Sequence, residues 1–189
     1  MIDPSKITNY SLTVPELQEH LFWWVCAAGK NGTTASRLLD VFLKKVNGYN
    51  YPPFTALKIV PFPLLAPMLK DCGIGCYTHK ARTMYDLSWS NLNLKTCTAE
   101  ELETIYGIGM KTSRCFIIHS RKGAQYAGLD THILKFLRAE GHDAPKSTPP
   151  KKKYLELEKI FLEIAKNKNK LPADLDLDIW NAYSIVSGK

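Results

Sequence analysis

The sequence predicts an all-α protein. Apolar residues recur three or four positions apart along most of the chain, which is the spacing of one helix face. No segment shows the apolar–polar alternation that is typical of strands, and glycines and prolines fall between the periodic segments. At 189 residues the chain suits one compact domain, or two small lobes that share a core. We expect about nine or ten helices.

The helices of the first half are mostly apolar. Residues 1–12 form an extended lead-in, and Thr13 and Glu16 then make a capping box, in which each side chain accepts from the other residue's amide. Phe22, Trp23 and Trp24 could form a platform for base stacking, but packing in the core is the commoner use of such residues. The predicted helices of this half cover residues 14–28, 33–46, 54–60, 64–69 and 77–87.

The second half begins with a second capping box, formed by Thr98 and Glu101. Lysines 151 to 153 follow a proline-rich loop, and a solvated helix start explains them better than a dedicated DNA contact. The predicted helices of this half cover residues 98–106, 110–121, 130–138, 151–164 and 174–184.

Charge and cysteine content restrict the class of protein. Lysine and arginine outnumber aspartate and glutamate by 25 to 18, a formal net charge of +7, which favours a polyanionic partner such as nucleic acid. Five cysteines, no signal-peptide pattern and no membrane-spanning apolar run indicate a reducing interior: the cytoplasm, or the nucleoid or nucleus where DNA lies. Cys72 and Cys76 have the spacing of half a metal site, but no second pair completes four ligands, so we expect no metal.

A glycine pair separates two of the predicted helices. Gly107-Ile108-Gly109 allows a sharp turn with positive φ at the glycines. The amides of this hairpin and of the next helical turn lack partners within a helix, so they can bind a phosphate without reading sequence. A plain turn between helices has the same spacing, so the glycines alone leave both interpretations open.

Three motifs, taken together, go further. Residues 107–112, GIGMKT, fit a G-φ-G-x-K-T hairpin, and residues 130–132, DTH, start a helix 19 positions after Lys111. Residues 74–81, IGCYTHKA, fit I-G-x-Y-x-x-K-A. In this order the motifs resemble the helix-hairpin-helix (HhH-GPD) DNA glycosylases, the superfamily of endonuclease III and the 8-oxoguanine glycosylases. The close match covers residues 72–138.

The resemblance implies a two-lobed, all-α HhH-GPD fold. Residues 12–124 would form a helical lobe that ends in the helix-hairpin-helix of residues 98–121. Residues 1–11 and 125–189 would form the second lobe, which carries Asp130, with a cleft between the lobes. Some members hold an iron–sulphur cluster with four C-terminal cysteines; this chain has no cysteine after Cys115, so we expect neither the cluster nor another cofactor.

The resemblance also assigns the chemistry. Lys111 would attack C1′ of the nucleotide to form a Schiff base, which makes the enzyme a bifunctional glycosylase and AP lyase. An amine attacks only when neutral, and we expect partial burial and the helix N-terminus to favour that form. Asp130 would stay ionised at the next helix start and assist by its charge and by proton transfer. Considered separately, Lys111 is also explained as a phosphate contact and Asp130 as a plain helix cap.

DNA contacts and a base pocket complete the predicted site. The residues expected to contact DNA are Gly107, Ile108, Gly109, Thr112 and Lys80. The damaged base must leave the stack and enter a pocket, for which we expect Lys30, Asn31, His132, Trp180 and Tyr183. Endonuclease III carries a glutamine near the position of Lys30 and Asn31, so this chain departs from it there. For Trp180 and Tyr183, stacking on the base and packing in the core stay equally open.

We expect the substrate to be double-stranded DNA with a damaged base, an oxidised purine such as 8-oxoguanine rather than an oxidised pyrimidine. The chain would act as a monomer without a membrane partner. Two other interpretations stay open: a non-catalytic HhH module that only binds DNA, and an enzyme of this fold that modifies unusual bases. The first predicts that Lys111→Gln keeps all function, and the second predicts a new adduct on the base.

Overall fold

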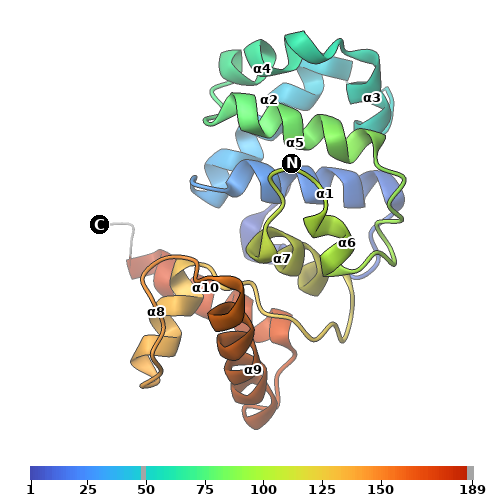
Figure 1. Cartoon of the computed structure of the whole chain (residues 1–189). Coiled ribbons are helices and arrows are strands. Elements are labelled where there is room, and N and C mark those ends of the chain that lie inside the picture. The colour runs from blue at the N-terminus through green and yellow to red at the C-terminus, as the bar shows by residue number, and fades with distance from the viewer. Residues whose placement is uncertain (48–49, 187–189) are drawn as a thin grey trace.

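The computed structural model describes residues 1–47 and 50–186, and in these ranges it consists of helices and loops without a strand (Figure 1). The all-α prediction is confirmed. The elements of the first half are η1 (Pro4–Lys6), α1 (Val14–Ala27), α2 (Gly32–Asn47), α3 (Pro53–Ile59), α4 (Phe62–Asp71) and α5 (Tyr77–Trp89). Those of the second half are α6 (Ala99–Glu103), α7 (Met110–Ser120), α8 (Thr131–Ala139), α9 (Lys151–Asn167) and α10 (Pro172–Val186).

Both capping boxes form. The amide of Thr98 donates to the Glu101 carboxylate at 2.7 Å, and the Glu101 amide donates to the Thr98 hydroxyl at 3.1 Å. At α1 the Thr13 amide donates to the Glu16 carboxylate at 2.7 Å. These bonds satisfy amides that have no partner inside the helix, so they fix where each helix begins.

Helices α1 to α7 surround one hydrophobic core. The central helix is α1, which contacts α2, α3, α5 and α7. Leu21, Phe22 and Phe42 are completely buried in this core, and Trp23 is 4% exposed. Phe22 therefore serves packing and is not available for base stacking.

Helices α8, α9 and α10 surround a second core, which occupies the lower part of the molecule in Figure 1. Its largest buried side chains are Tyr154 and Phe161 of α9, with Leu134 and Leu137 of α8 beside them. Helix α10 contacts α8 and α9 and also reaches α7 of the first core. The predicted division of the chain near residue 124 agrees with the position of the two cores but stays a prediction.

The N-terminal segment differs from the predicted assignment to the second lobe. Ile7 is buried in the first core, at 5% exposure. The Ser36 hydroxyl donates to the Ile2 carbonyl, and the Asn9 amide donates to the His119 carbonyl at 2.9 Å. Contrary to the expectation, the segment is not extended throughout, because η1 forms within it and the Lys6 amide donates to the Asp3 carbonyl at 3.1 Å. Backbone groups outside this turn take partners from the first lobe.

A buried ion pair joins the two lobes. Arg114 of α7, whose side chain is 2% exposed, donates from Nε to the Glu158 carboxylate of α9 at 2.9 Å. Arg114 also pairs with Glu103, and the same Glu158 oxygen accepts the Ala127 amide at 2.9 Å. Burial raises the pKa of Glu158, and the Ala127 amide and the Arg114 charge oppose this. These directional contacts fix the second lobe against α7, which sets the geometry of the space between the lobes.

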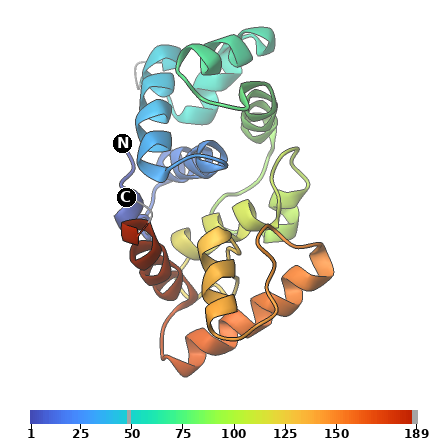
Figure 2. The ribbon, with the colours of Figure 1, turned by 90° about the vertical axis from the view of Figure 1, so that its left-hand side faces the viewer.

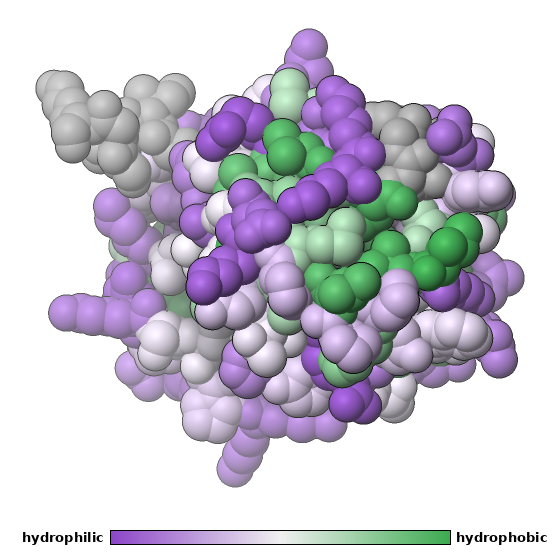
Figure 3. Space-filling view, turned by 90° about the horizontal axis from the view of Figure 1, so that it is seen from above, coloured by the Kyte–Doolittle hydropathy of each residue, from purple (hydrophilic) through white to green (hydrophobic). Residues whose placement is uncertain are grey.

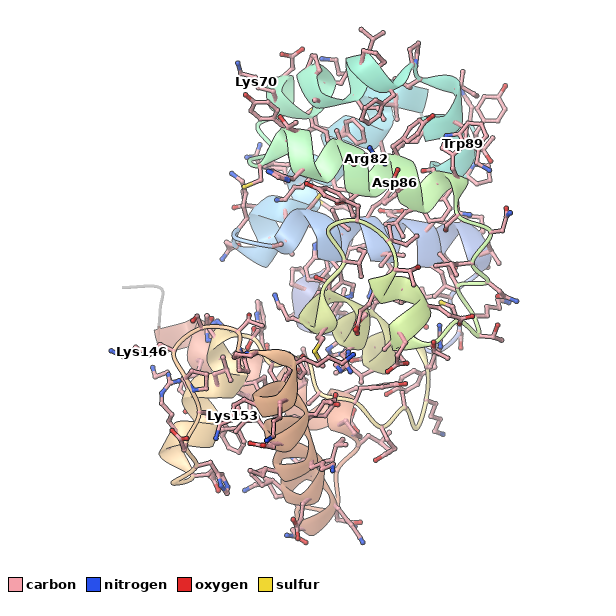
Figure 4. All side chains as sticks on the ribbon, viewed as in Figure 1. Lys70, Arg82, Asp86, Trp89, Lys146 and Lys153 are labelled. Atoms are coloured by element: carbon pink, nitrogen blue, oxygen red, sulfur yellow. The ribbon has the colours of Figure 1, made fainter. Side chains whose placement is uncertain are left out.

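The outer surface carries apolar and charged features away from this space. Seen from above, apolar side chains gather on the far end of the first lobe, where Ile59, Phe62 and Leu64 are exposed (Figure 3). On α9, Lys153 pairs with Asp143 at 3.0 Å, which fits a solvated helix start (Figure 4). Among the described residues, no helix combines the length and the apolar character needed to cross a membrane.

Candidate active site

The predicted hairpin forms between α6 and α7, but the backbone conformation requires a glycine only at Gly107 and not at Gly109. Gly107 has φ +79°, and an added Cβ there would collide with the Thr83 hydroxyl. Gly109 has φ −101° and ψ 175°, which any residue can adopt, and no atom lies within 4 Å of an added Cβ. The prediction of positive φ at Gly109 was therefore wrong. Ile108, between them, is 5% exposed and anchors the hairpin in the core.

Open space at Gly109 faces the start of α7. Gly109 is the N-cap of this helix and uses no side chain to cap it. Thr112 and Lys111 lie half-buried in the first turn. The unpaired amides at the start of α7, and the positive end of its helix dipole, are therefore accessible from outside the protein. This arrangement can bind a phosphate.

Lys80 does not belong to this surface, and its assignment as a DNA contact is corrected. Its side chain is 6% exposed, and Nζ donates to the carbonyls of Cys26 at 2.9 Å and Ala28 at 3.1 Å. The last carbonyls of α1 lack hydrogen-bond donors within the helix, and the Lys80 ammonium group donates to two of them. Burial lowers the pKa of this ammonium group. Two residues along, Arg82 stays on the surface and pairs with Asp86 at 2.6 Å (Figure 4).

A cleft of about 640 Å³ lies between the two cores and contains most of the predicted site. The first lobe contributes Lys111 at the start of α7, and the second contributes Asp130 at the start of α8. Four of the five predicted base-pocket residues also line it: Lys30, Asn31, His132 and Trp180. Figure 2 shows α10 beside the N-terminal segment, and both contribute to the wall of the cleft. The tertiary structure thus brings the predicted nucleophile and carboxylate into one cavity.

The contacts of the predicted base-pocket residues show which of them face the cleft and which support its wall. Asn31 caps α2, because its side-chain oxygen accepts the Thr33 amide at 2.9 Å. Tyr183 does not line the cleft; its ring stacks on His132 with centroids 6.2 Å apart and an interplanar angle of 24°. Tyr183 therefore supports the imidazole that faces the cavity. Trp180 itself is half-buried and borders the open space.

Asp130 combines a capping role with a half-buried carboxylate in the cleft. Its Oδ1 accepts the amides of His132 and Ile133, each at 2.8 Å. Burial raises the pKa of Asp130, and the nearby Asp176 carboxylate raises it further, while the Ile133 amide and the Lys111 charge act in the opposite direction. We expected the amides and dipole of the helix start to stabilise the charged form of this carboxyl; burial and a second carboxylate outweigh them and shift the pKa upward.

Sequence reasoning missed a second acidic residue in the cleft. Asp176 of α10 is 9% exposed and accepts from Nε2 of His119 at 3.1 Å. His119 is fully buried on α7, bonded through Nδ1 to the Thr8 hydroxyl at 2.7 Å and stacked on Trp24. The available signal was an acidic residue one helical turn before Trp180, on the face of α10 that packs inward. Among the described residues, no group of three histidine, cysteine or acidic side chains is placed to hold a metal ion.

Comparisons with known proteins show which family the chain is similar to. The family model described as 8-oxoguanine DNA glycosylase, Ogg-HhH, matches residues 64–170. Proteins named 8-oxoguanine DNA glycosylase/AP lyase from Picrophilus torridus and Thermoplasma volcanium are 34% and 38% identical over 79 residues. That match covers 42% of this chain and 37% of each relative, so the chain aligns with little more than a third of their length.

Solved structures show the same fold over more of the chain. The 8-oxoguanine DNA glycosylase of Thermotoga maritima superposes with a TM-score of 0.69 at 22% identity, covering 93% of this chain and 81% of that chain. The 8-oxoguanine glycosylase/lyase of Methanocaldococcus jannaschii, in complex with a 15mer DNA containing 8-oxoguanine, gives 0.70 at 21% identity, with 96% and 87% covered. The matched family model spans both the hairpin and the Asp130 helix, and this chain belongs to the helix-hairpin-helix 8-oxoguanine DNA glycosylase family.

Proposed function

We propose that this protein is a bifunctional DNA glycosylase and AP lyase that removes 8-oxoguanine from double-stranded DNA, acting as a monomer wherever the DNA lies. The observation that carries the proposal is the position of Lys111 and Asp130 in one cleft, between an exposed hairpin and an aromatic wall. The names of the relatives and the DNA complex of the Methanocaldococcus jannaschii protein support the same substrate.

The hairpin holds the DNA backbone in this proposal. Gly107, Gly109 and the first turn of α7, with Lys111 and Thr112, present amides to phosphates, and these contacts carry no sequence information. The net charge of +7 adds long-range attraction for the polyanion. The damaged nucleotide then leaves the stack and enters the cleft, because C1′ cannot be reached inside a duplex.

Lys111 performs the covalent step. Its neutral amine forms a bond to C1′ while the bond from C1′ to the base nitrogen breaks, and the base leaves with that electron pair and takes up a proton. Opening of the sugar ring gives a Schiff base, and loss of a proton from C2′ then expels the 3′ phosphate by β-elimination.

Asp130 assists both stages. Its negative charge stabilises the positive character that develops on the sugar. Its raised pKa brings the carboxyl closer to neutral pH, so that it exchanges protons more readily than an ordinary aspartate. His132 and Trp180 border the space for the extruded base, where the indole offers a stacking face.

Borohydride trapping tests this proposal. The protein is incubated with duplexes that carry 8-oxoguanine, an oxidised pyrimidine or no lesion, and borohydride reduces any Schiff base to a stable adduct. We expect an adduct on the 8-oxoguanine duplex and none with Lys111→Gln. Equal trapping by Lys111→Gln removes this lysine from the mechanism. Tight binding with neither trapping nor excision indicates a binding module, and a modified base in place of an abasic site indicates a modifying enzyme.

A further inference from the structure

The loop between α1 and α2 forms the rim of the cleft on the side of the first lobe. Ala28, Gly29, Lys30 and Asn31 all line the cavity, and all four are exposed. Gly29 has φ +75°, and nothing lies within 4 Å of an added Cβ there, so the loop borders open space. An exposed loop has few packing contacts, so its position depends on what holds its ends.

Lys80 holds the first end of this loop. Its Nζ donates to the carbonyl of Cys26, in the last turn of α1, and to that of Ala28, where the chain leaves the helix. The distances are 2.9 and 3.1 Å. Both bonds end on one nitrogen of a buried side chain, so together they fix the peptide groups that follow Cys26 and Ala28.

The charges around Lys80 show that it does not serve an ion pair. Among the described residues its ammonium group donates to the two carbonyls and to no carboxylate. Burial lowers the pKa of this ammonium group, and the positive charge of Lys30 on the loop lowers it further. A buried charge without a counter-charge is unfavourable, and water could donate to the carbonyl of exposed Ala28 instead. The lysine provides what water does not, a donor with a fixed position.

The segment before α5 supports the same loop at a second point. Helix α5 packs on α1 (Figure 1). An added Cβ at Gly75 would lie 3.4 Å from Cε and 3.8 Å from Nζ of Lys30, so the Lys30 side chain lies across the Gly75 backbone. Gly75 and Lys80 are both positions of the IGCYTHKA segment, residues 74–81. This segment therefore contacts the loop beside the cleft at two of its positions.

We propose that Lys80 is a positioning residue for base excision, which fixes the α1–α2 loop as one wall of the space for the extruded base. This inference rests on the proposed glycosylase function. Lys80 is not among the residues that line the cleft, so it acts through residues 28–31. A displaced wall lets the base and its sugar turn away from Lys111, and a misplacement of about 1 Å can cost about 100-fold in rate.

Lys80→Met tests the inference, because it removes both hydrogen bonds and keeps an unbranched side chain. We expect single-turnover excision of 8-oxoguanine to fall about 10- to 100-fold, while affinity for the duplex stays within a few-fold. A preformed abasic site has no base for the wall to orient. Borohydride should therefore trap Lys80→Met on abasic DNA as well as it traps wild type.

Hydrogen exchange measured by mass spectrometry locates the change. The Lys30 amide donates to the Ala27 carbonyl at 3.0 Å and reports on the order of the loop. In Lys80→Met, exchange should increase more in peptides that cover residues 27–32 than in those of α7 and α8. An equal increase throughout the chain would mean that the variant only destabilises the fold, which contradicts the inference.

Leu65→Ala is the matched control for lost stability. Leu65 is completely buried on α4 and does not line the cleft, so its truncation destabilises the first lobe without touching the loop. It should excise 8-oxoguanine normally at a temperature where it is folded. If Leu65→Ala slows excision as much as Lys80→Met does, the effect of Lys80 is one of stability and the inference is wrong.

The remaining outcomes separate this inference from the proposed function. Normal excision by folded Lys80→Met overturns the inference, and so does an equal loss of excision and of abasic trapping. If Lys80→Met does not fold, Lys80→Gln is the milder variant, since its amide keeps N–H donors on a shorter side chain; the same separation of excision from trapping is expected, with a smaller loss. Failure of the wild type on both the 8-oxoguanine and the abasic duplex refutes the glycosylase function itself.

Discussion

The two hairpin glycines should respond differently to substitution, because the structure gives them different reasons to be glycine. Gly109→Val places a branched side chain on extended backbone, at φ −101°, with no protein atom within 4 Å of its Cβ. Gly107→Ala places a Cβ at φ +79° and against the Thr83 hydroxyl. The first change should affect the DNA and the second should affect the fold.

The expected magnitudes follow from these environments. Left-handed backbone costs a non-glycine residue roughly 1–2 kcal/mol, so Gly107→Ala should lose at least that much stability, and the collision with Thr83 adds to it. Gly109→Val should keep its unfolding free energy to within about 1 kcal/mol, the usual range for a changed N-cap. Its side chain fills the space where a phosphate would approach the amides, and losing such a contact should weaken DNA binding about 10- to 100-fold.

Two measurements decide the outcome. Urea unfolding followed by circular dichroism gives the stability of each variant, and fluorescence anisotropy gives its affinity for duplexes with and without 8-oxoguanine at fixed salt. Gly109→Val should bind both duplexes more weakly by the same factor, because phosphate contacts carry no lesion information. If folded Gly109→Val binds undamaged DNA as tightly as wild type, the hairpin is not the DNA-binding element.

Three further substitutions test the other parts of the site. Asp130→Asn should retain DNA affinity to within a few-fold, while excision falls by orders of magnitude in single-turnover assays. Because folding raises the pKa of Asp130, this carboxyl contributes its full stability at pH below the unfolded value of 3.8, and the contribution is lost as pH rises through the folded value. Asp130→Asn should therefore be at least as stable as wild type in urea unfolding at pH 7. A clear loss of stability there would contradict this reasoning. Glu158→Gln leaves buried Arg114 with Glu103 as its carboxylate partner and weakens one charged hydrogen bond, so it should cost about 1.5–3 kcal/mol in denaturant unfolding. The exposed Glu156→Gln on the same helix should change little. Lys80→Met should lose about 1–3 kcal/mol of stability with its two hydrogen bonds but leave the salt dependence of DNA binding unchanged; a smaller salt slope would restore Lys80 as a phosphate contact.

The sequence alone determined the features that depend on neighbours a few positions away. Helix periodicity, the capping boxes at Thr13 and Thr98 and the glycine turn involve backbone groups within one or two helical turns. They form as expected, except that Gly109 lacks the predicted positive φ. The order and spacing of the hairpin and of the Asp130 helix start also sufficed to predict the family. These properties are local because the hydrogen bonds that create them are local.

Tertiary structure decided the environment of each side chain. The sequence around Lys80 predicts a lysine on the helix surface. In the structure the side chain is buried against the end of α1, and its ammonium group caps the last carbonyls of that helix. The N-terminal segment has no pattern of its own and was predicted to join the wrong lobe, because only packing shows that Ile7 belongs to the first core.

The same holds for the electrostatics of the cleft. His119 and Asp176 are 57 positions apart, so no local pattern joins them, and their partnership exists only because α10 folds back to reach α7. Burial and Asp176 together reverse the expected direction of the Asp130 pKa shift. A helix start stabilises charge through a few adjacent amides, which a sequence reveals, whereas desolvation and opposing charge depend on every element packed around the group.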